Sequence, residues 1–348
     1  MTAAPGQHQA VTADTSAGTS VTWPARPYSR PLLPNLAPAV QTPPEPPQRG
    51  LAAAEVAEPR FAAAYRELDI ALDHRDKIYW CYLRPDGAPS FTHGILRELA
   101  DMQRSIKRMF AEVSSPLDAP IRHFVVGSRL PGIFNMGGDL AFFADRIRAG
   151  DRAALADYAR ACIEVVYNNA TALDVPIVTI ALVQGDALGG GFEAALSCDV
   201  IVAERSAKFG LPEILFNLFP GMGAYSLLCR RLEPARAERM ILGGRIYGAA
   251  ELHEMGLVDV LAEDEAGEDA VRRYIARQQR RQAAHRAVCA VRRRINPLTF
   301  KELQDVTDMW VDTALRLDEA DLRKMARLMA AQRRRVLHGA RLKAAAAP

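Results

Sequence analysis

The period of apolar positions changes repeatedly after about residue 61. Short runs of aliphatic and aromatic residues, typical of buried strands, alternate with stretches in which apolar residues recur every three or four positions. This alternation predicts βαβ units and a mainly parallel sheet, followed after Pro234 by an almost wholly helical region with breaks near Gly243-Gly244 and Gly256–Leu261. The predicted strands are Lys77–Leu83, Ile121–Gly127, Pro176–Gly185 and Val200–Ala203, and the predicted helices are Thr92–Val113, Leu140–Ala149 and Arg152–Asn168.

The first 50 residues differ in composition from the rest of the chain. They hold 10 of the 22 prolines and only two acidic residues, and Thr42–Pro47 (TPPEPP) is typical of polyproline II. A segment without apolar periodicity cannot bury a core, so we expect a disordered proline-rich tail over 1–58. We then expect an α/β core over 59–262, a C-terminal helical subdomain over 263–338 and a short tail over 339–348.

Composition and charge exclude several classes of protein. Hydrophobic residues make up 49% and charged residues 24% of the chain, as in ordinary globular proteins, and the net charge of +3 is too small to indicate a nucleic-acid binder. No apolar run approaches the roughly 20 residues of a membrane-spanning helix, and no secretory signal is recognisable, so a cytoplasmic protein is expected. The scattered cysteines fit neither a disulfide framework nor a zinc site, and the histidines show no metal-binding spacing.

The segment Leu182–Asp199 (LVQGDALGGGFEAALSCD) is the most informative part of the sequence. A buried strand ends in it, and Gly189-Gly190-Gly191 then opens a helix rich in alanine and leucine. Glycine lets a backbone approach a ligand closely, and N–H groups at a helix N-terminus stabilise negative charge. The segment lacks the lysine and the glycine spacing of nucleotide-binding loops. Tight packing of the helix on the sheet would explain the same glycines.

Two glutamates and a second glycine turn add to this signal. Glu193 falls in the first turn of the helix, where it would complement the helix dipole. Glu213 lies within the apolar LPEILF, where desolvation would raise its pKa towards acid–base duty, although it could also cap a helix that begins near Pro212. In Phe134–Leu140 (FNMGGDL), Asp139 would cap a helix or fix the loop. The three features together favour a functional site.

These segments resemble the crotonase (enoyl-CoA hydratase/isomerase) superfamily. In that family an AGxD-type turn and a GGG-type turn each donate one backbone N–H to a thioester oxygen, and the match places these donors on Gly138 and Gly190. The two hydratase glutamates of the family match Glu193 and Glu213. The resemblance implies a crotonase (ClpP/crotonase-like ββα spiral) core with a C-terminal α-helical subdomain, no metal or other cofactor, and homotrimers or hexamers.

Within the superfamily, the longest motifs are similar to the bacterial diffusible signal factor synthases, which make cis-2-unsaturated fatty acid signals. These motifs are FNMGGDLAFFADRIRAGDR, ALVQGDALGGGFEAALS, GLPEILFNLFPGMGAYS and WVDTALRL. Asp186 and Asn217 depart from the branch, in which Asn and Asp are expected at these positions. The resemblance implies dehydration of a 3-hydroxyacyl thioester and then thioester hydrolysis, with acyl-carrier protein or CoA as the carrier and a sensor kinase as a further partner.

An acyl chain requires an apolar pocket beside the glycine turns. Each residue proposed for this pocket could also be ordinary core, which is the favoured explanation for Phe143 and Met136. Trp310 is a stronger candidate, because in the family that the chain resembles the C-terminal helices fold over the active site. Four basic clusters could face an acidic carrier protein or could simply be solvated helix faces. The pocket candidates are Met136, Leu140, Leu188, Gly189, Met222 and Trp310, and the clusters are Arg272-Arg273, Arg280-Arg281, Arg292–Arg294 and Arg333–Arg335.

Two other functions compete with this hypothesis. One is an ordinary enoyl-CoA hydratase of fatty-acid catabolism, against which the motifs GMGAYS and WVDTALRL argue. The other is a catalytically silent crotonase-like binding or regulatory protein, for which loss of the glutamates or of the glycine donors would be expected. Both glutamates and both glycines are present.

Overall fold

The computed structural model describes residues 65–111, 113 and 118–345, which belong to one compact unit, Glu58–Pro348. The tail expected over 1–58 lies outside the described residues. The unit is built on a six-stranded sheet in which only the first strand runs antiparallel to its neighbour. In spatial order its strands are β1 (Leu68–Asp73), β2 (Ile78–Leu83), β3 (His123–Ser128), β5 (Val178–Val183), β7 (Val200–Glu204) and β10 (Val260–Ala262).

A second, four-stranded sheet consists of three-residue strands. Three of them follow directly on strands of the large sheet, so that the chain contributes one strand to each sheet before the next helix or 3-10 turn. This succession is the expected ββα spiral. In spatial order the strands are β4 (Ile133–Asn135), β6 (Asp186–Leu188), β8 (Lys208–Gly210) and β9 (Ile246–Gly248).

Helices complete the unit. Those that follow the strands directly are short or medium in length, and the last four α-helices form the C-terminal helical region. The helical elements are α1 (His93–Met109), α2 (Leu140–Arg148), α3 (Arg152–Ala170), η2 (Ala172–Asp174), α4 (Gly190–Leu196), η3 (Pro212–Phe216), α5 (Ala224–Cys229), α6 (Pro234–Gly243), α7 (Ala249–Glu254), α8 (Gly267–Gln278), η4 (Gln279–Arg281), α9 (Gln282–Ile295), α10 (Phe300–Ala314) and α11 (Glu319–Ala345).

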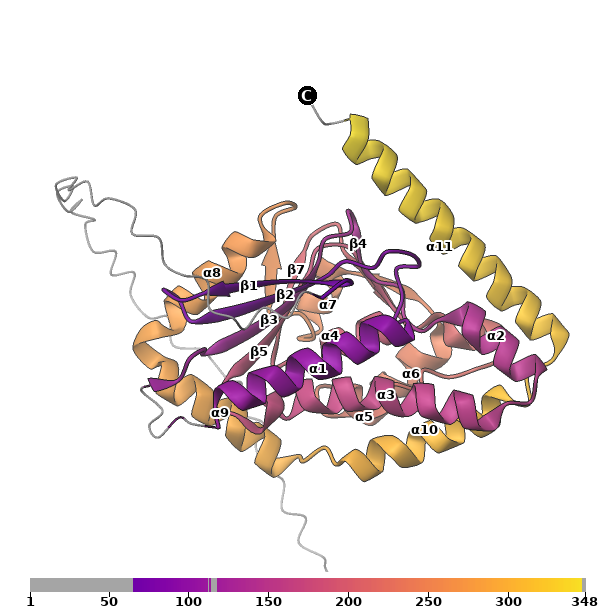
Figure 1. The fold of residues 1–348 in the computed structure, drawn as a ribbon, viewed down its shortest axis with the longest axis horizontal. Helices are drawn as coiled ribbons and strands as arrows, with labels where there is room; N and C mark the ends of the chain where they lie inside the picture. The colour runs from indigo at the N-terminus through magenta and orange to yellow at the C-terminus, as the bar shows by residue number, and fades with distance from the viewer. Residues whose placement is uncertain (1–64, 112, 114–117, 346–348) are drawn as a thin grey trace, which may run out of the picture. The chain divides into compact units, whose positions relative to one another are not determined.

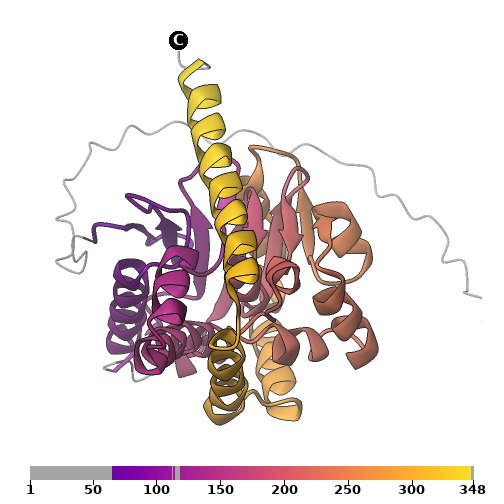
Figure 2. The same ribbon diagram turned by 90° about the vertical axis from the view of Figure 1, so that its right-hand side faces the viewer.

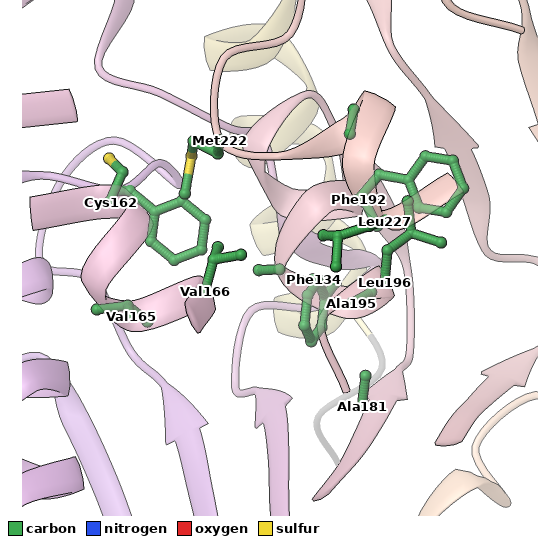
Figure 3. Packing of buried hydrophobic residues seen from close by; sticks show 14 of the residues in the cluster. Phe134, Cys162, Val165, Val166, Ala181, Phe192, Ala195, Leu196, Met222 and Leu227 are labelled. Carbon is green, nitrogen blue, oxygen red and sulfur yellow. The ribbon is translucent and has the colours of Figure 1, made fainter. Parts of the chain in front are cut away.

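The four central strands of the large sheet, β2, β3, β5 and β7, are buried on both faces, which explains why they are mostly apolar along their whole length. Alternate residues of β2 point to opposite faces: Ile78, Trp80 and Tyr82 pack with residues of α8, whereas Tyr79 and Cys81 join the larger cluster. Figure 1 shows α1, α3 and α10 lying side by side along this second face. Helix α4 is buried throughout, and Figure 3 shows its side chains packed among those of α3 and β5.

The sequence pattern predicted the central strands and helices to within a few residues. It missed the edge strands β1 and β10 and the second sheet. The strands of the second sheet and β10 have three residues each, too few to show an apolar period, and β1 (LDIALD) is partly exposed and carries polar residues. Helix α1 begins after the Thr92 cap and ends at Met109, four residues before the predicted end. In the part of the chain that the structure describes, no helix combines the length and apolar character needed to cross a membrane.

Helix α11 takes a separate course from the helices on the sheet. It contacts α2 and η3, and Figure 2 shows it standing across the front of the unit in yellow. A hydrogen bond of 3.1 Å from Asn217 Nδ2 to Asp321 Oδ2 and an ion pair of 2.9 Å between Arg148 and Glu319 fix its start. The C-terminal helix therefore lies beside the loops in which the glutamates and glycines of interest occur.

Candidate active site

The first glycine turn connects β4 to α2. The Gly137 N–H donates to Asn135 Oδ1 at 2.7 Å, and Asp139 caps α2 by accepting from the Phe142 N–H at 3.1 Å. Gly137 has a φ of +94°, and a Cβ there would lie 2.9 Å from the Leu188 carbonyl oxygen. Glycine is therefore required for the first turn to touch the second.

The second glycine turn connects β6 to α4. The Gly189 N–H donates to the Gly210 carbonyl at 2.8 Å, and Gly189 has a φ of +53°, which leaves Gly190 as the first residue of the helix. The N–H groups of Gly138 and Gly190 donate to no acceptor among the described residues. Both residues line one cavity of about 340 Å³. Two unused donors on adjacent turns can stabilise an oxyanion placed in that cavity.

Glu193 is held by the backbone of the loop that precedes α5. Its Oε1 accepts from the N–H groups of Met222 and Ala224, both at 2.8 Å, and the residue is only 1% exposed. Burial raises the pKa of this carboxyl, and the hydrogen bonds from the backbone partly offset the rise. The loop motif GMGAYS thus positions one oxygen of the carboxylate and supports its charged form.

Glu213 has much less support for a negative charge. The residue before η3, Leu211, provides no side-chain cap, and Glu213 itself lies in the first turn of η3. Its Oε2 is inaccessible and has no hydrogen-bond partner among the described residues, and a Cβ at Gly189 would lie 2.5 Å from its Oε1. Burial and repulsion by Glu193 raise the pKa of Glu213. An uncompensated carboxyl of this kind favours its protonated form.

Glu193 and Glu213 line the same cavity and influence each other's titration. Two buried carboxyls that repel each other lose their protons in separate steps, so that over an intermediate pH range the pair carries one proton and one negative charge. Such a pair supplies a proton acceptor and a proton donor at the same time. General acid–base chemistry at two adjacent atoms of one substrate requires this combination.

The structure brings every residue that the sequence singled out as a candidate to this one cavity. Four are the glutamates and the donor glycines, and the others form apolar walls in which the rings of Phe143 and Trp310 meet at 5.0 Å. Phe143 lines the cavity as well as packing in the core. The ten candidates are Met136, Gly138, Leu140, Leu188, Gly189, Gly190, Glu193, Glu213, Met222 and Trp310.

Sequence reasoning missed the part of the wall that comes from other segments. Tyr158 and Cys162 of α3 contribute to it, and α11 contributes Leu328, Gln332 and Arg335. These residues lie in none of the motifs that resemble the family, although Arg335 belongs to the basic cluster Arg333–Arg335. The only signal available was their spacing of three or four positions, which marks a helix face but does not show what that face covers.

Several basic clusters have internal partners. Arg272 pairs with Asp73 at 2.5 Å, and Arg292 and Arg293 both bind the buried Asp199, at 2.9 and 2.6 Å. These arginines brace the fold, whereas Arg280 and Arg281 remain exposed. All five cysteines are free, and the described residues include no group of three or more side chains suited to a metal ion.

A ββα spiral with two touching glycine turns beside a cavity defines a protein of the crotonase fold. Residues 109–328 match the family model for enoyl-CoA hydratase/isomerase, and the chain belongs to that family. It is 33% identical over 177 residues to the mitochondrial methylglutaconyl-CoA hydratase of Rattus norvegicus, an alignment covering 50% of this chain and 54% of that protein. The chain thus spans about half the length of the curated relatives that it matches.

Solved structures support the same fold. Pseudomonas aeruginosa DspI is 25% identical, with a TM-score of 0.56 over 72% of this chain and 91% of that chain. The enoyl-CoA hydratase of Bacillus halodurans has a TM-score of 0.61 over 75% of this chain and 99% of its own, at 20% identity. The second comparison concerns the fold alone.

Proposed function

We propose that the protein removes water from a 3-hydroxyacyl thioester and then hydrolyses the thioester, releasing a cis-2-unsaturated fatty acid. One observation carries the proposal: two buried carboxyls and two unused backbone donors surround a single cavity. Membership of the enoyl-CoA hydratase/isomerase family supports the hydratase-type step. The similarity of the motifs to the signal factor synthases supports the second step and the cis product.

The dehydration step uses both carboxyls. The charged carboxyl takes the proton from C2, the C2–H electron pair forms the double bond, and the C3–O bond breaks as the neutral carboxyl protonates the departing hydroxyl group. The negative charge that develops on the thioester oxygen is stabilised by the Gly138 and Gly190 N–H groups, each worth about 10²–10³ in rate in comparable sites. The pair again holds one proton when water has left.

The hydrolysis step uses the same donors. Water attacks the thioester carbonyl carbon, a carboxylate takes its proton, and Gly138 and Gly190 stabilise the tetrahedral oxyanion. The C–S bond then breaks, and the sulfur leaves as a thiol with a proton from the neutral carboxyl. The products are the free enoic acid and the carrier thiol, and no oxidant, reductant or metal enters the balance.

The walls of the cavity suit a medium or long acyl chain. Leu140, Leu188 and Trp310 present apolar surface to it, and each methylene group buried there would contribute about 0.8 kcal/mol. We propose Met136 and Met222 as further contacts of the chain, because methionine adapts to irregular gaps. Replacing Leu188 or Trp310 with a residue of different size should change the preferred chain length.

Product analysis tests the proposal. The protein is incubated with 3-hydroxydodecanoyl-carrier protein, and cis-2-dodecenoic acid is expected by mass spectrometry. Recovery of trans-2-enoyl thioester or of hydrated products alone would reject the signal-synthase function in favour of an ordinary enoyl-CoA hydratase, which the name of the Rattus norvegicus relative supports. Unchanged turnover by both Glu193→Gln and Glu213→Gln would reject the assigned carboxyls, and exposed Glu238 provides a matched Glu→Gln control.

A further inference from the structure

Helix α11 forms both a wall of the cavity and part of the outer surface. Gln332 Nε2 donates to the Met136 carbonyl at 3.2 Å, and Arg335 forms an ion pair of 2.5 Å with Asp186. Gln332, Arg335 and Asp186 all line the cavity, yet the side chain of Arg335 is 55% exposed. This region of α11 therefore lies where the cavity opens to the solvent.

The sequence of α11 is strongly basic beyond its first turn. From Leu322 to Ala345 it contains eight lysines and arginines and no acidic residue. Arg327 and Arg334 are exposed and form no ion pair with any described residue. A spacing of seven places them on one face of the helix, beside the row that lines the cavity. The helix continues for ten residues beyond Arg335, or about 15 Å.

An apolar rim lies next to this opening. Leu215 and Ile246 line the cavity and are 52% and 44% exposed, and nearby Leu242 is 60% exposed. A Cβ at Gly244 would contact Leu215 at 3.4 Å, so the segment after α6 packs against η3 at this point. Exposed apolar side chains gathered beside a cavity are typical of a surface that another molecule covers.

We propose that the basic face of α11 and this apolar rim form the docking surface for an acidic acyl-carrier protein that delivers the thioester into the cavity. The inference rests on the proposed function and names the carrier. A nucleotide needs a few cations at the opening and would leave the rim uncovered. An acidic protein can cover the rim and pair with Arg327 and Arg334 of α11, and such charge complementarity accelerates association and fixes orientation.

Two charge-reversed variants test the surface. Arg327→Glu/Arg334→Glu alters the proposed surface, and Arg277→Glu/Arg281→Glu is the control, because these two arginines are exposed and form no ion pair with a described residue. They lie in the segment where α8 ends and α9 begins, and Figure 1 shows α8 and α9 on the opposite side of the unit from α11. Each is assayed with 3-hydroxydodecanoyl thioesters of carrier protein, CoA and pantetheine. Binding of unacylated holo-carrier protein is measured separately by fluorescence anisotropy.

The α11 variant should raise KM for the carrier-protein substrate and Kd for the holo-carrier protein by about tenfold or more, with kcat within about twofold. KM for the CoA and pantetheine thioesters should stay unchanged, as should every constant of the control. An equal rise in KM for CoA would overturn the inference in favour of a phosphate site, and an unchanged Kd would overturn it outright. If the wild type turns over none of the thioesters, the proposed function fails, and Kd still decides whether this surface binds the carrier protein.

Discussion

Replacing Glu213 with glutamine should remove activity and yet make the protein more stable at alkaline pH. Burial and the charge of Glu193 raise the pKa of Glu213, and its Oε2 has no hydrogen-bond partner among the described residues. Ionisation is therefore easier in the unfolded chain than in the folded one. The stability that this group contributes is fully present below its usual pKa and is lost as pH rises through the raised value. Glutamine has nearly the same shape and never acquires the charge.

The size of the effect follows from the burial of the carboxyl. Each pKa unit corresponds to about 1.4 kcal/mol, and fully buried carboxyls show rises of about 3 units. At pH 9 the Glu213→Gln variant should therefore have a free energy of unfolding about 3–4 kcal/mol above that of the wild type. At pH 4 both side chains are neutral, and the two proteins should agree to within about 1 kcal/mol.

Urea unfolding followed by circular dichroism at several values between pH 4 and pH 9 measures the difference. Both proteins retain the titration of Glu193, so the predicted quantity is the difference: the free energy of unfolding of the wild type minus that of the variant should fall as pH rises from 4 to 9. The Glu238→Gln variant, changed at an exposed position, is the control. Its free energy of unfolding should stay within about 0.5 kcal/mol of that of the wild type at every pH. A difference that is independent of pH, or a wild type that is the more stable protein at pH 9, would refute the reasoning.

Three further substitutions test other parts of the site. Glu193→Gln should lower kcat by about 10²–10⁴ with little change in KM, because it removes one acid–base group, and a stopped assay of product would show this. Gly189→Ala should cost about 1–3 kcal/mol, because Gly189 has a φ of +53° and a ψ of −127°, a region nearly confined to glycine, and the new Cβ would displace the Glu213 carboxyl, so Tm and kcat should fall together. Trp310→Ala should lower the free energy of unfolding, measured with urea, by about 3–5 kcal/mol. It should also shift the substrate preference towards longer or bulkier acyl chains, and an unchanged chain-length profile would contradict the role of Trp310 in the pocket.

The sequence predicted the four central strands of the large sheet, β2, β3, β5 and β7, because they are buried on both faces, whereas the edge strands β1 and β10 are only partly buried and were missed. Val178–Val183 is apolar at every position except Thr179, and the buried hydroxyl of Thr179 is satisfied by the main-chain carbonyl of Asn169 and by Asp199. The second sheet could not be predicted in this way, because its strands take their positions from glycines that let neighbouring loops touch. A Cβ at Gly191, for example, would overlap the backbone of Asn135.

Parts of the candidate site could be predicted where a functional residue and the helix end that positions it belong to the same short motif. Gly190 and Glu193 share the start of α4, so a few adjacent residues describe the helix end and the acid. The absence of a partner for Glu213 was not predictable, because it depends on how η3 packs against the turn at Gly189. The contribution of α11 was also beyond the sequence, since Arg335 meets Asp186 across 149 positions.

Asp186 and Asn217, the two residues that depart from the signal-synthase motifs, are both explained by their contacts with α11. Asp186 binds Arg335 through both oxygens, at 2.5 and 2.9 Å, and asparagine in its place would leave that guanidinium beside the cavity without a charged partner. Asn217 donates to Asp321 at 3.1 Å, and aspartate there would set two carboxylates against each other. Both exchanges therefore suit the charges that α11 brings to the opening of the cavity. Positions that looked like independent deviations in separate loops act together, since each fastens the same helix beside the site.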